Sequence, residues 1–487
     1  MNKSQLKNFC KKSRFILFLI LLVFFLKGVL LATLHPIFDG QDEARHYNTV
    51  QYLAEPKEKN WDISTDLPEH NRNNFETYRF SEEIKKTATL ANNDVLRTDI
   101  FNTIIFSDDY NGINETEINQ KNLQPINKTY PPDVVSGAIF YHKVATVIEK
   151  IFTNQSILVR FYLIRILSVL FGTMAVLFSY WIIKNIGFSE KHSLLLTVII
   201  AFQPKFSDYL SNINYDALTI LMFFLFTLGG VLMLKKGLNW KNFILMLFSS
   251  FIAFKTKGTG VVLFGMLALM LLYFFHQKIE NKQNYLKKSF YIIFTAILVI
   301  LFLYFKRFLP LGNRSILQII LSLFEYLGAT LTVGKFMASA NTYWGALSWV
   351  NNPILDKAIY IIWFIQAFAI AGLGLFFFSK QAKPKYLPEK KYIIFLLVIT
   401  LALQIGVRAY DWKIFSSCNC FALGLPGRYF LPNLTSHIIL VFVGLGTIFS
   451  YFKKENYFNN ALKIGIIAMS SLSLYLIFNL IIYRFYL

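Results

Sequence analysis

Long apolar runs recur along the 487-residue chain, and they constrain its fold more than any other feature. An α-helix needs a run of about 20 apolar residues to cross a hydrocarbon core about 30 Å thick. A membrane β-barrel would show short alternating segments instead. Mean hydropathy is +0.45, and only 16% of the residues are charged, against about 25% in an average soluble domain. We therefore expect an all-α polytopic membrane protein.

The distribution of lysine divides the apolar runs into about eleven membrane-spanning helices, because lysine-rich connectors favour the cytoplasmic side. The basic N-terminal tail then predicts a cytoplasmic N-terminus, followed by an uncleaved first span. Charge parity keeps the short run 191–204 as a span and divides 240–276 into two. It leaves 315–333 as an outer-face or re-entrant helix. The expected spans are 15–34, 157–183, 191–204, 216–234, 240–255, 258–276, 289–306, 357–379, 391–408, 434–452 and 461–485.

Three regions follow from this topology: the tail and first helix (1–34), a large extracytoplasmic loop or subdomain (35–155) and a transmembrane helical domain (156–487). The net charge of +21 fits topology and anionic lipid better than nucleic acid, because the lysines cluster between apolar runs. The three cysteines, Cys10, Cys418 and Cys420, show neither zinc nor redox spacing. The sequence contains no P-loop motif and no nucleophile-elbow motif.

An acidic cluster directly follows the first span, where Asp39, Asp42 and Glu43 stand beside Arg45 and His46. A carboxylate at such a place can act as a general base toward an acceptor hydroxyl. Two acids could also divide roles or hold a divalent cation. The alternative is a set of solvated charges offset by Arg45. If residues 42–53 are helical, His46 shares a face with Asp42 and could orient the carboxylate or donate to a substrate oxygen. The alternative is an ordinary histidine at the membrane interface.

Basic residues occupy later outer loops and make candidates for binding a phosphate. Lys255 and Lys257 lie in the turn between two expected spans, and Arg428 with Tyr429 follows Gly427. Arginine recognises phosphate in a bidentate manner, and glycine permits close backbone approach. The alternative for Arg428 is an arginine that anchors its helix by reaching the interface.

Four further residues are candidates for substrate binding. Asp216 opens a span after Asn214, although an N-cap role is the better supported interpretation of this acid. Trp344 lies near the membrane interface, where a tryptophan usually anchors its helix. The alternative is that its ring stacks on a sugar. Tyr130 belongs to a Tyr-Pro-Pro sequence in the large loop.

Taken in order, seven motifs resemble domain-of-unknown-function family 2142, a family of bacterial membrane proteins. They are Gln41-Asp42-Glu43-Ala44-Arg45-His46, Tyr130-Pro131-Pro132, Arg160 with Arg165, Pro204 with Asn214-Tyr215-Asp216-Ala217, Lys257-Gly258, Trp344-Gly345, and Gly427-Arg428-Tyr429 with Pro432. The resemblance covers nearly the whole chain. The sequence departs from the family pattern at Gln41, where proline is common, and at Arg45, where a small residue or proline is common.

That family is similar to the GT-C glycosyltransferases, which use polyprenyl-phosphate sugars on the outer face of the membrane. The resemblance implies sugar transfer to a cell-envelope glycan, lipid or protein. It makes Asp42 the leading base with Glu43 second, and it makes Arg428 a phosphate ligand with Lys257. Arg45 could lower the pKa of a neighbouring acid, so the choice between Asp39, Asp42 and Glu43 stays open. The alternatives are a transporter or flippase for lipid-linked glycans and a non-catalytic partner in envelope polysaccharide assembly.

Overall fold

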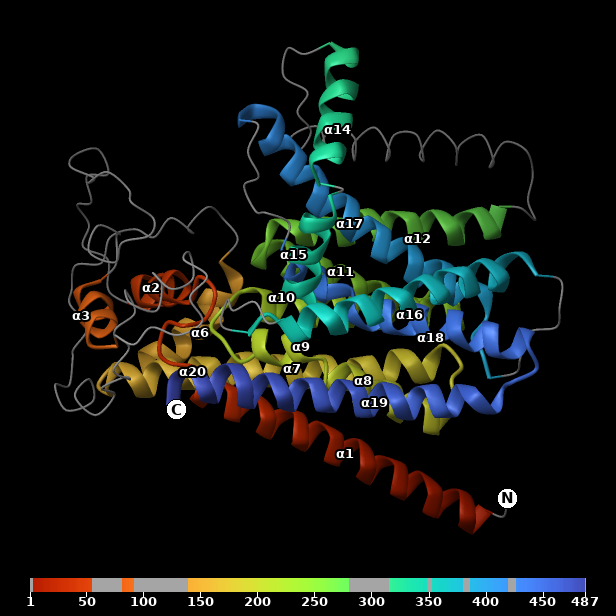
Figure 1. The fold of residues 1–487 in the computed structure, drawn as a ribbon, viewed down its shortest axis with the longest axis horizontal. Coiled ribbons are helices and arrows are strands. Elements are labelled where there is room, and N and C mark those ends of the chain that lie inside the picture. Colours follow the sequence, from red (N-terminus) through yellow and green to blue (C-terminus); the bar gives the residue numbers. More distant parts are fainter. Residues whose placement is uncertain are drawn as a thin grey trace.

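The computed structural model describes residues 3–54, 81–91, 139–279, 315–330, 332–347, 353–379, 386–418 and 426–486 (Figure 1). Every regular element in these ranges is a helix, which confirms the all-α prediction. The helices are α1 (Lys3–Leu34), α2 (Glu43–Ala54), α3 (Glu82–Leu90), α6 (Phe140–Ile151), α7 (Ile157–Asn185), α8 (Glu190–Ala201), α9 (Pro204–Tyr209), α10 (Asp216–Lys236), α11 (Trp240–Thr256), η1 (Gly258–Gly260), α12 (Val261–Ile279), α14 (Ile316–Thr330), α15 (Val333–Trp344), α16 (Pro353–Phe378), α17 (Lys390–Cys418), η4 (Gly427–Asn433), α18 (Leu434–Tyr451), α19 (Asn456–Leu476), η5 (Ile477–Ile482) and α20 (Tyr483–Tyr486).

Within these ranges, eight helical segments are long and apolar enough to cross a membrane. They are Lys12–Leu34, Ile157–Asn185, Asp216–Lys236, Gly258–Gln277, Leu355–Phe378, Lys390–Ser416, Gly427–Tyr451 and Asn456–Ile482. The predicted count of about eleven is not confirmed. The expected span 289–306 lies outside the described residues. α8 has only 12 residues, and at about 1.5 Å per residue it is too short to cross alone.

Two other features of the predicted topology concern residues 240–276 and 315–333. Residues 240–276 do form two helices, α11 and α12, which are separated at Lys257. α14 and α15 are bent by 66° at the break between them, the geometry of a broken span or a re-entrant loop. α14 stands out from the bundle beside α17 (Figure 1).

α10 lies at the centre of the bundle. Its apolar window is 83% buried, whereas that of α16 is 17% buried. The sequence of α10 explains this position, because a helix that is apolar on all sides has no face suited to water and packs inside the protein. α10 contacts α7, α11, α17 and η4. Its first residue, Asp216, therefore begins inside the protein rather than at its surface.

The two ends of the bundle differ in character. Figure 1 shows α2, α3 and α6 gathered at one end, near the C-terminus and away from the N-terminus. Lysines lie at the C-terminal ends of α7 and α10. There, Lys235 Nζ lies 3.1 Å from Asn185 Oδ1, and Lys184 forms an ion pair with Glu190 at 2.8 Å. The N-terminal ends of the same two helices carry the candidate site described below.

α16 and α18 pack closely through glycine. A Cβ atom added at Gly444 would overlap the backbone of Ala369, and one at Gly372 would overlap the backbone of Gly444. Small residues let membrane helices approach to backbone contact, where packing supplies much of the association energy.

We predict that Gly444→Ala lowers stability by about 1–3 kcal/mol, because α16 and α18 must separate to admit the methyl group. Thermal unfolding of the detergent-purified protein measures the effect. Gly374→Ala is the matched control, since a Cβ there meets no atom within 4 Å. Equal melting temperatures for the two variants would contradict the close packing.

Candidate functional site

Chain segments far apart in the sequence meet at the end of the bundle that carries α2 and α6. The end of α1, the start of α7, the α9–α10 turn, the α11–α12 turn and η4 all contribute. Buried contacts join them: Glu43 with Arg165, Asp216 with Lys257, and the Arg428 guanidinium beside the Tyr209 ring. Four of the motifs that the topology placed on one side of the membrane, at Glu43, Asp216, Lys257 and Arg428, therefore do lie together.

Lys257 and Asp216 form the first part of the site. The backbone of Lys257 is extended, which ends α11 and turns the side chain toward α10. Its Nζ lies 2.6 and 2.8 Å from the two carboxylate oxygens of Asp216. The Tyr209 hydroxyl donates to Asp216 Oδ2 at 2.6 Å. Asp216 is thus held as an ion-pair partner at the start of the central helix.

The N-cap interpretation of Asp216 is wrong. Tyr215 occupies the N-cap position without a side-chain cap, and Oδ1 of Asn214, one residue earlier, accepts from the Ala217 backbone N–H at 3.1 Å. Asn214 Nδ2 also donates to the Tyr209 backbone carbonyl at 2.8 Å. Asn214, predicted to bind substrate, therefore shapes the turn before α10.

A second cation, Arg428, joins Lys257 around the ring of Tyr429. Lys257 Nζ lies 4.2 Å and Arg428 Cζ 5.1 Å from the centroid of that ring. Gly427 allows this arrangement, because a Cβ there would overlap the backbone of Ser339 in α15. Aromatic faces stabilise nearby cations. Two positive charges thus lie beside Tyr429, and Asp216 supplies one negative charge against them.

Asp42 is the exposed acid of this cluster. Its side chain is 47% exposed, and it interacts electrostatically with both Lys257 and Arg428. Arg45 contacts it only at 3.5 Å, and Arg45 is itself partly exposed. The φ angle of Asp42 is 57°, a left-handed conformation that is uncommon outside glycine. Phe38, four residues earlier, has the same conformation with a φ of 66°, so backbone strain marks the first loop rather than Asp42 alone.

Glu43, the neighbour of Asp42, is completely buried and bound on both oxygens. Arg165 donates from Nε to Oε1 at 2.8 Å and from Nη2 to Oε2 at 2.6 Å. The backbone N–H groups of Ile213 and Gly40 donate to the same carboxylate at 2.8 and 3.1 Å. Both oxygens are occupied and the side chain is closed to solvent, so the carboxylate offers no open lone pair to a substrate hydroxyl. Glu43 thus holds the first loop in position, which differs from its predicted role as second base.

We predict that Glu43→Gln destabilises the protein by about 3–5 kcal/mol, because it leaves the Arg165 guanidinium buried without its counter-charge. Denaturant-induced unfolding in detergent measures the loss. The control is Glu190→Gln, which removes the partly exposed pair with Lys184 and should cost no more than about 1 kcal/mol. Losses of equal size would show that the buried pair is not needed.

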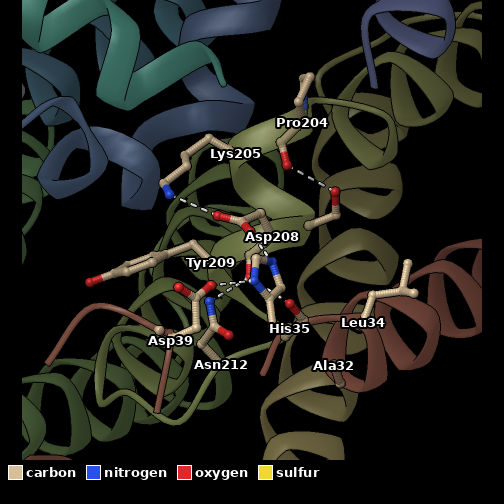
Figure 2. Close-up of polar contacts among 12 residues, drawn as sticks. Ala32, Leu34, His35, Asp39, Pro204, Lys205, Asp208, Tyr209 and Asn212 are labelled. Atoms are coloured by element: carbon tan, nitrogen blue, oxygen red, sulfur yellow. Dashed lines mark hydrogen bonds and ion pairs between the residues drawn. The ribbon is translucent and has the colours of Figure 1, made fainter. Parts of the chain in front are cut away.

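Asp39, the third candidate acid, belongs to a buried network around His35 (Figure 2). His35 Nδ1 lies 2.8 Å from Asp39 Oδ2, and Nε2 lies 2.7 Å from Asp208 Oδ1. Lys205 Nζ donates to the other oxygen of Asp208 at 2.7 Å and to the Ala346 carbonyl at 2.8 Å. Both imidazole nitrogens face carboxylates, so His35 is an imidazolium that ties the first loop to α9.

Burial lowers the pKa of His35, but the hydrogen bonds and charges of Asp208 and Asp39 outweigh it and raise the pKa to about 9. Burial likewise acts to raise the pKa of Asp208, yet Lys205 and His35 bring it down to about 2. His35 thus gains protons on folding relative to its ordinary pKa of 6.5. Its stabilisation is complete below pH 6.5 and is lost as pH rises through 9.

We predict that the wild-type protein loses up to about 3 kcal/mol more stability between pH 6.5 and pH 9 than His35→Gln does, since 1 pKa unit corresponds to about 1.4 kcal/mol. Unfolding of both proteins across this range gives the difference, in which other titrating groups cancel. Parallel pH profiles would contradict an imidazolium at His35.

A second buried cluster fixes the first-loop helices. Arg160 in α7 pairs with Glu83 of α3 and Glu149 of α6, and the Tyr47 hydroxyl of α2 donates to Glu149. Burial, opposed by Arg160, raises the pKa of Glu83 to about 7. The two arginines of the Arg160–Arg165 motif therefore anchor the subdomain that carries Asp42. Two arginines on an otherwise apolar helix were the sequence signal for these buried ion pairs. Nothing in the sequence singled out His35, Asp208 or His142.

The remaining predicted site residues lie elsewhere or are tightly packed. The side chain of Lys255 is exposed, and its Nζ lies 5.9 Å from the centroid of the Phe251 ring. Trp344 is buried against Tyr343 and His437 and offers no open face for a sugar. Tyr130 lies outside the described residues. Among the residues that the structure describes, no group of three or more His, Cys, Asp or Glu could hold a metal ion.

The model of a family described as predicted membrane proteins, DUF2142, matches residues 24–436. The chain belongs to this family. No curated protein and no solved structure matches the chain. The DUF2142 match includes Asp42, Asp216, Lys257, Arg428 and Tyr429, so the whole candidate site lies within the family region.

Proposed function

We propose that this DUF2142 protein is an inverting, GT-C-like membrane glycosyltransferase. It transfers a sugar from a polyprenyl-phosphate carrier to a cell-envelope acceptor on the extracytoplasmic face. The observation that supports this most is the pairing of two cations beside Tyr429 with one exposed carboxylate, Asp42. The two cations can bind a phosphate group, and the carboxylate can act as a general base.

The proposed reaction assigns a role to each of these residues. Asp42 accepts the proton of an acceptor hydroxyl, whose oxygen forms a bond to the anomeric carbon of the sugar. The bond from that carbon to the phosphate oxygen breaks, and the polyprenyl phosphate leaves with the electron pair. Lys257 and Arg428 stabilise the charge that develops on this oxygen. Asp216 holds Lys257 in position through its two short contacts.

The position of the site in the bundle suits a lipid-linked donor. Asp216, Lys257 and Arg428 lie at the ends of apolar helices, where a polyprenyl chain can stay in lipid while its phosphate reaches polar groups. The lysine-bearing ends of α7 and α10 lie at the other end of the bundle. The positive-inside bias then puts those lysines in the cytoplasm and the site outside.

One observation favours the second candidate, a transporter or flippase for lipid-linked glycans. Lys27 lies within the first span, with Nζ 3.5 Å from the Ala201 carbonyl at the end of α8 and 5.0 Å from the centroid of the Phe202 ring. A charge inside a membrane helix beside a break between helices is typical of transport sites. Transport requires no base, so the two functions differ in their need for Asp42.

We predict that Asp42→Asn lowers sugar transfer by about 10²–10⁴-fold, the usual contribution of a general base. The assay uses purified protein in lipid vesicles with a radiolabelled polyprenyl-phosphate sugar and envelope extract as acceptor. Arg428→Gln should weaken donor binding as well as lower the rate. Glu325→Gln, an exposed acid on α14, is the matched control.

Transfer that survives both Asp42→Asn and Arg428→Gln would overturn the glycosyltransferase proposal. Movement of the labelled lipid across the vesicle membrane, unaffected by Asp42→Asn, would support the transporter instead.

A further inference from the structure

A pair of buried histidines lies next to the candidate site. His46 of α2 and His142 of α6 are hydrogen-bonded, with His46 Nδ1 3.0 Å from His142 Nε2. The His46 ring also packs edge-to-face on Tyr215, with centroids 4.6 Å apart. Burial lowers the pKa of both groups, that of His46 to about 4. Both rings are therefore neutral near pH 7, and each carries a single N–H.

Two arrangements of the protons satisfy the hydrogen bond. In one, His46 donates from Nδ1, which forces the proton of His142 onto its own Nδ1. In the other, His142 donates from Nε2, which leaves the proton of His46 on Nε2. The choice decides what His46 offers the site, because Nε2 is a lone-pair acceptor in the first case and a hydrogen-bond donor in the second.

The surroundings of His142 oppose the first arrangement. His142 Nδ1 is buried, and it has no hydrogen-bond partner among the residues that the structure describes. A proton there would be a buried donor without an acceptor, and such orphaned donors are rare in folded proteins. The free histidine side chain also prefers its proton on Nε2, and the second arrangement satisfies this preference in both rings.

The charges around His46 favour the same arrangement. The groups that act on its ring are the acids Asp42 and Asp216, followed by the weaker effects of Lys257 and Arg45. Both acids act on the ring more strongly than either cation, and carboxylates attract an N–H and repel a lone pair. His46 Nε2 makes no hydrogen bond to another residue within the described ranges, so its proton is not already committed to the protein there.

We propose that His142 holds His46 in the tautomer with its proton on Nε2, which makes His46 a hydrogen-bond donor to a ligand oxygen and excludes it as the base. His142 is a positioning residue in this arrangement, since it acts through His46. That the ligand oxygen belongs to a phosphate rests on the proposed function, whereas the tautomer of His46 does not depend on it. Proton transfer then falls to Asp42.

Nitrogen-15 NMR of histidine-labelled protein in lipid bilayers tests the tautomer without any ligand, because protonated and bare ring nitrogens give well-separated signals. The chain has 7 histidines, and the signals of His46 are those lost in His46→Gln. We expect a protonated Nε2 and a bare, hydrogen-bonded Nδ1. A protonated Nδ1 in the wild-type protein would overturn the proposal.

Two variants test the part played by His142. His142→Gln places an amide N–H near the position of the imidazole Nε2 and should preserve the His46 signals. His142→Leu removes the donor and should give a mixture of His46 tautomers. His192→Gln is the matched control, because the ring of His192 contacts Asn459 and not His46. An unchanged His46 spectrum in folded His142→Leu would show that His142 does not set the tautomer.

Binding of a polyprenyl monophosphate, with the uncharged polyprenol as reference, tests the ligand. Loss of one hydrogen bond predicts binding about three- to tenfold weaker in His142→Leu and nearly unchanged in His142→Gln. Equal affinity in both variants would overturn the donor role of His46. If wild-type protein shows the expected tautomer but does not prefer the phosphate to the polyprenol, the proposed function fails while the tautomer assignment stands.

Discussion

The buried pair of Glu43 and Arg165 fixes the geometry of the candidate site. Arg165 extends from the first turns of α7, and its remaining N–H groups bind the carbonyls of Ala32, His35 and Pro36. One guanidinium therefore holds the end of α1, the first loop and α7 together. A buried pair of this kind is not a large source of net stability, because desolvation offsets most of the attraction. Removal of either partner would leave the other charge buried alone, so the pair ties the position of the loop to that of α7.

The conformation of the first loop depends on this pair and on His35. Phe38 and Asp42 both have left-handed φ angles, of 66° and 57°. Each is next to an anchored acid, Asp39 on the His35 imidazolium and Glu43 on Arg165. Strained residues persist only where the surroundings over-determine them. Two buried acids thus impose the turn that leaves the acid between them, Asp42, exposed beside Lys257 and Arg428.

The sequence predicted the helical membrane class, the break between α11 and α12 and the gathering of the outer-loop motifs, because these depend on hydropathy and on charge along the chain. It could not separate the three acids. The partner of Glu43 is 122 residues away and one partner of His35 is 173 residues away, so neither contact leaves a local pattern. The N-cap assignment of Asp216 failed for the same reason. Its position after a turn is typical of a cap, but its partner, Lys257, comes from a distant segment.

Lys257 lies near two acids, Asp216 and Asp42, and the position of Asp216 decides which of them it binds. Asp216 engages it directly, with both oxygens within 2.8 Å of Nζ, and Tyr209 holds Asp216 in turn. Arg428 is then the cation left to meet a donor phosphate in the proposed reaction, and Asp42 is the exposed carboxylate left to meet the acceptor hydroxyl.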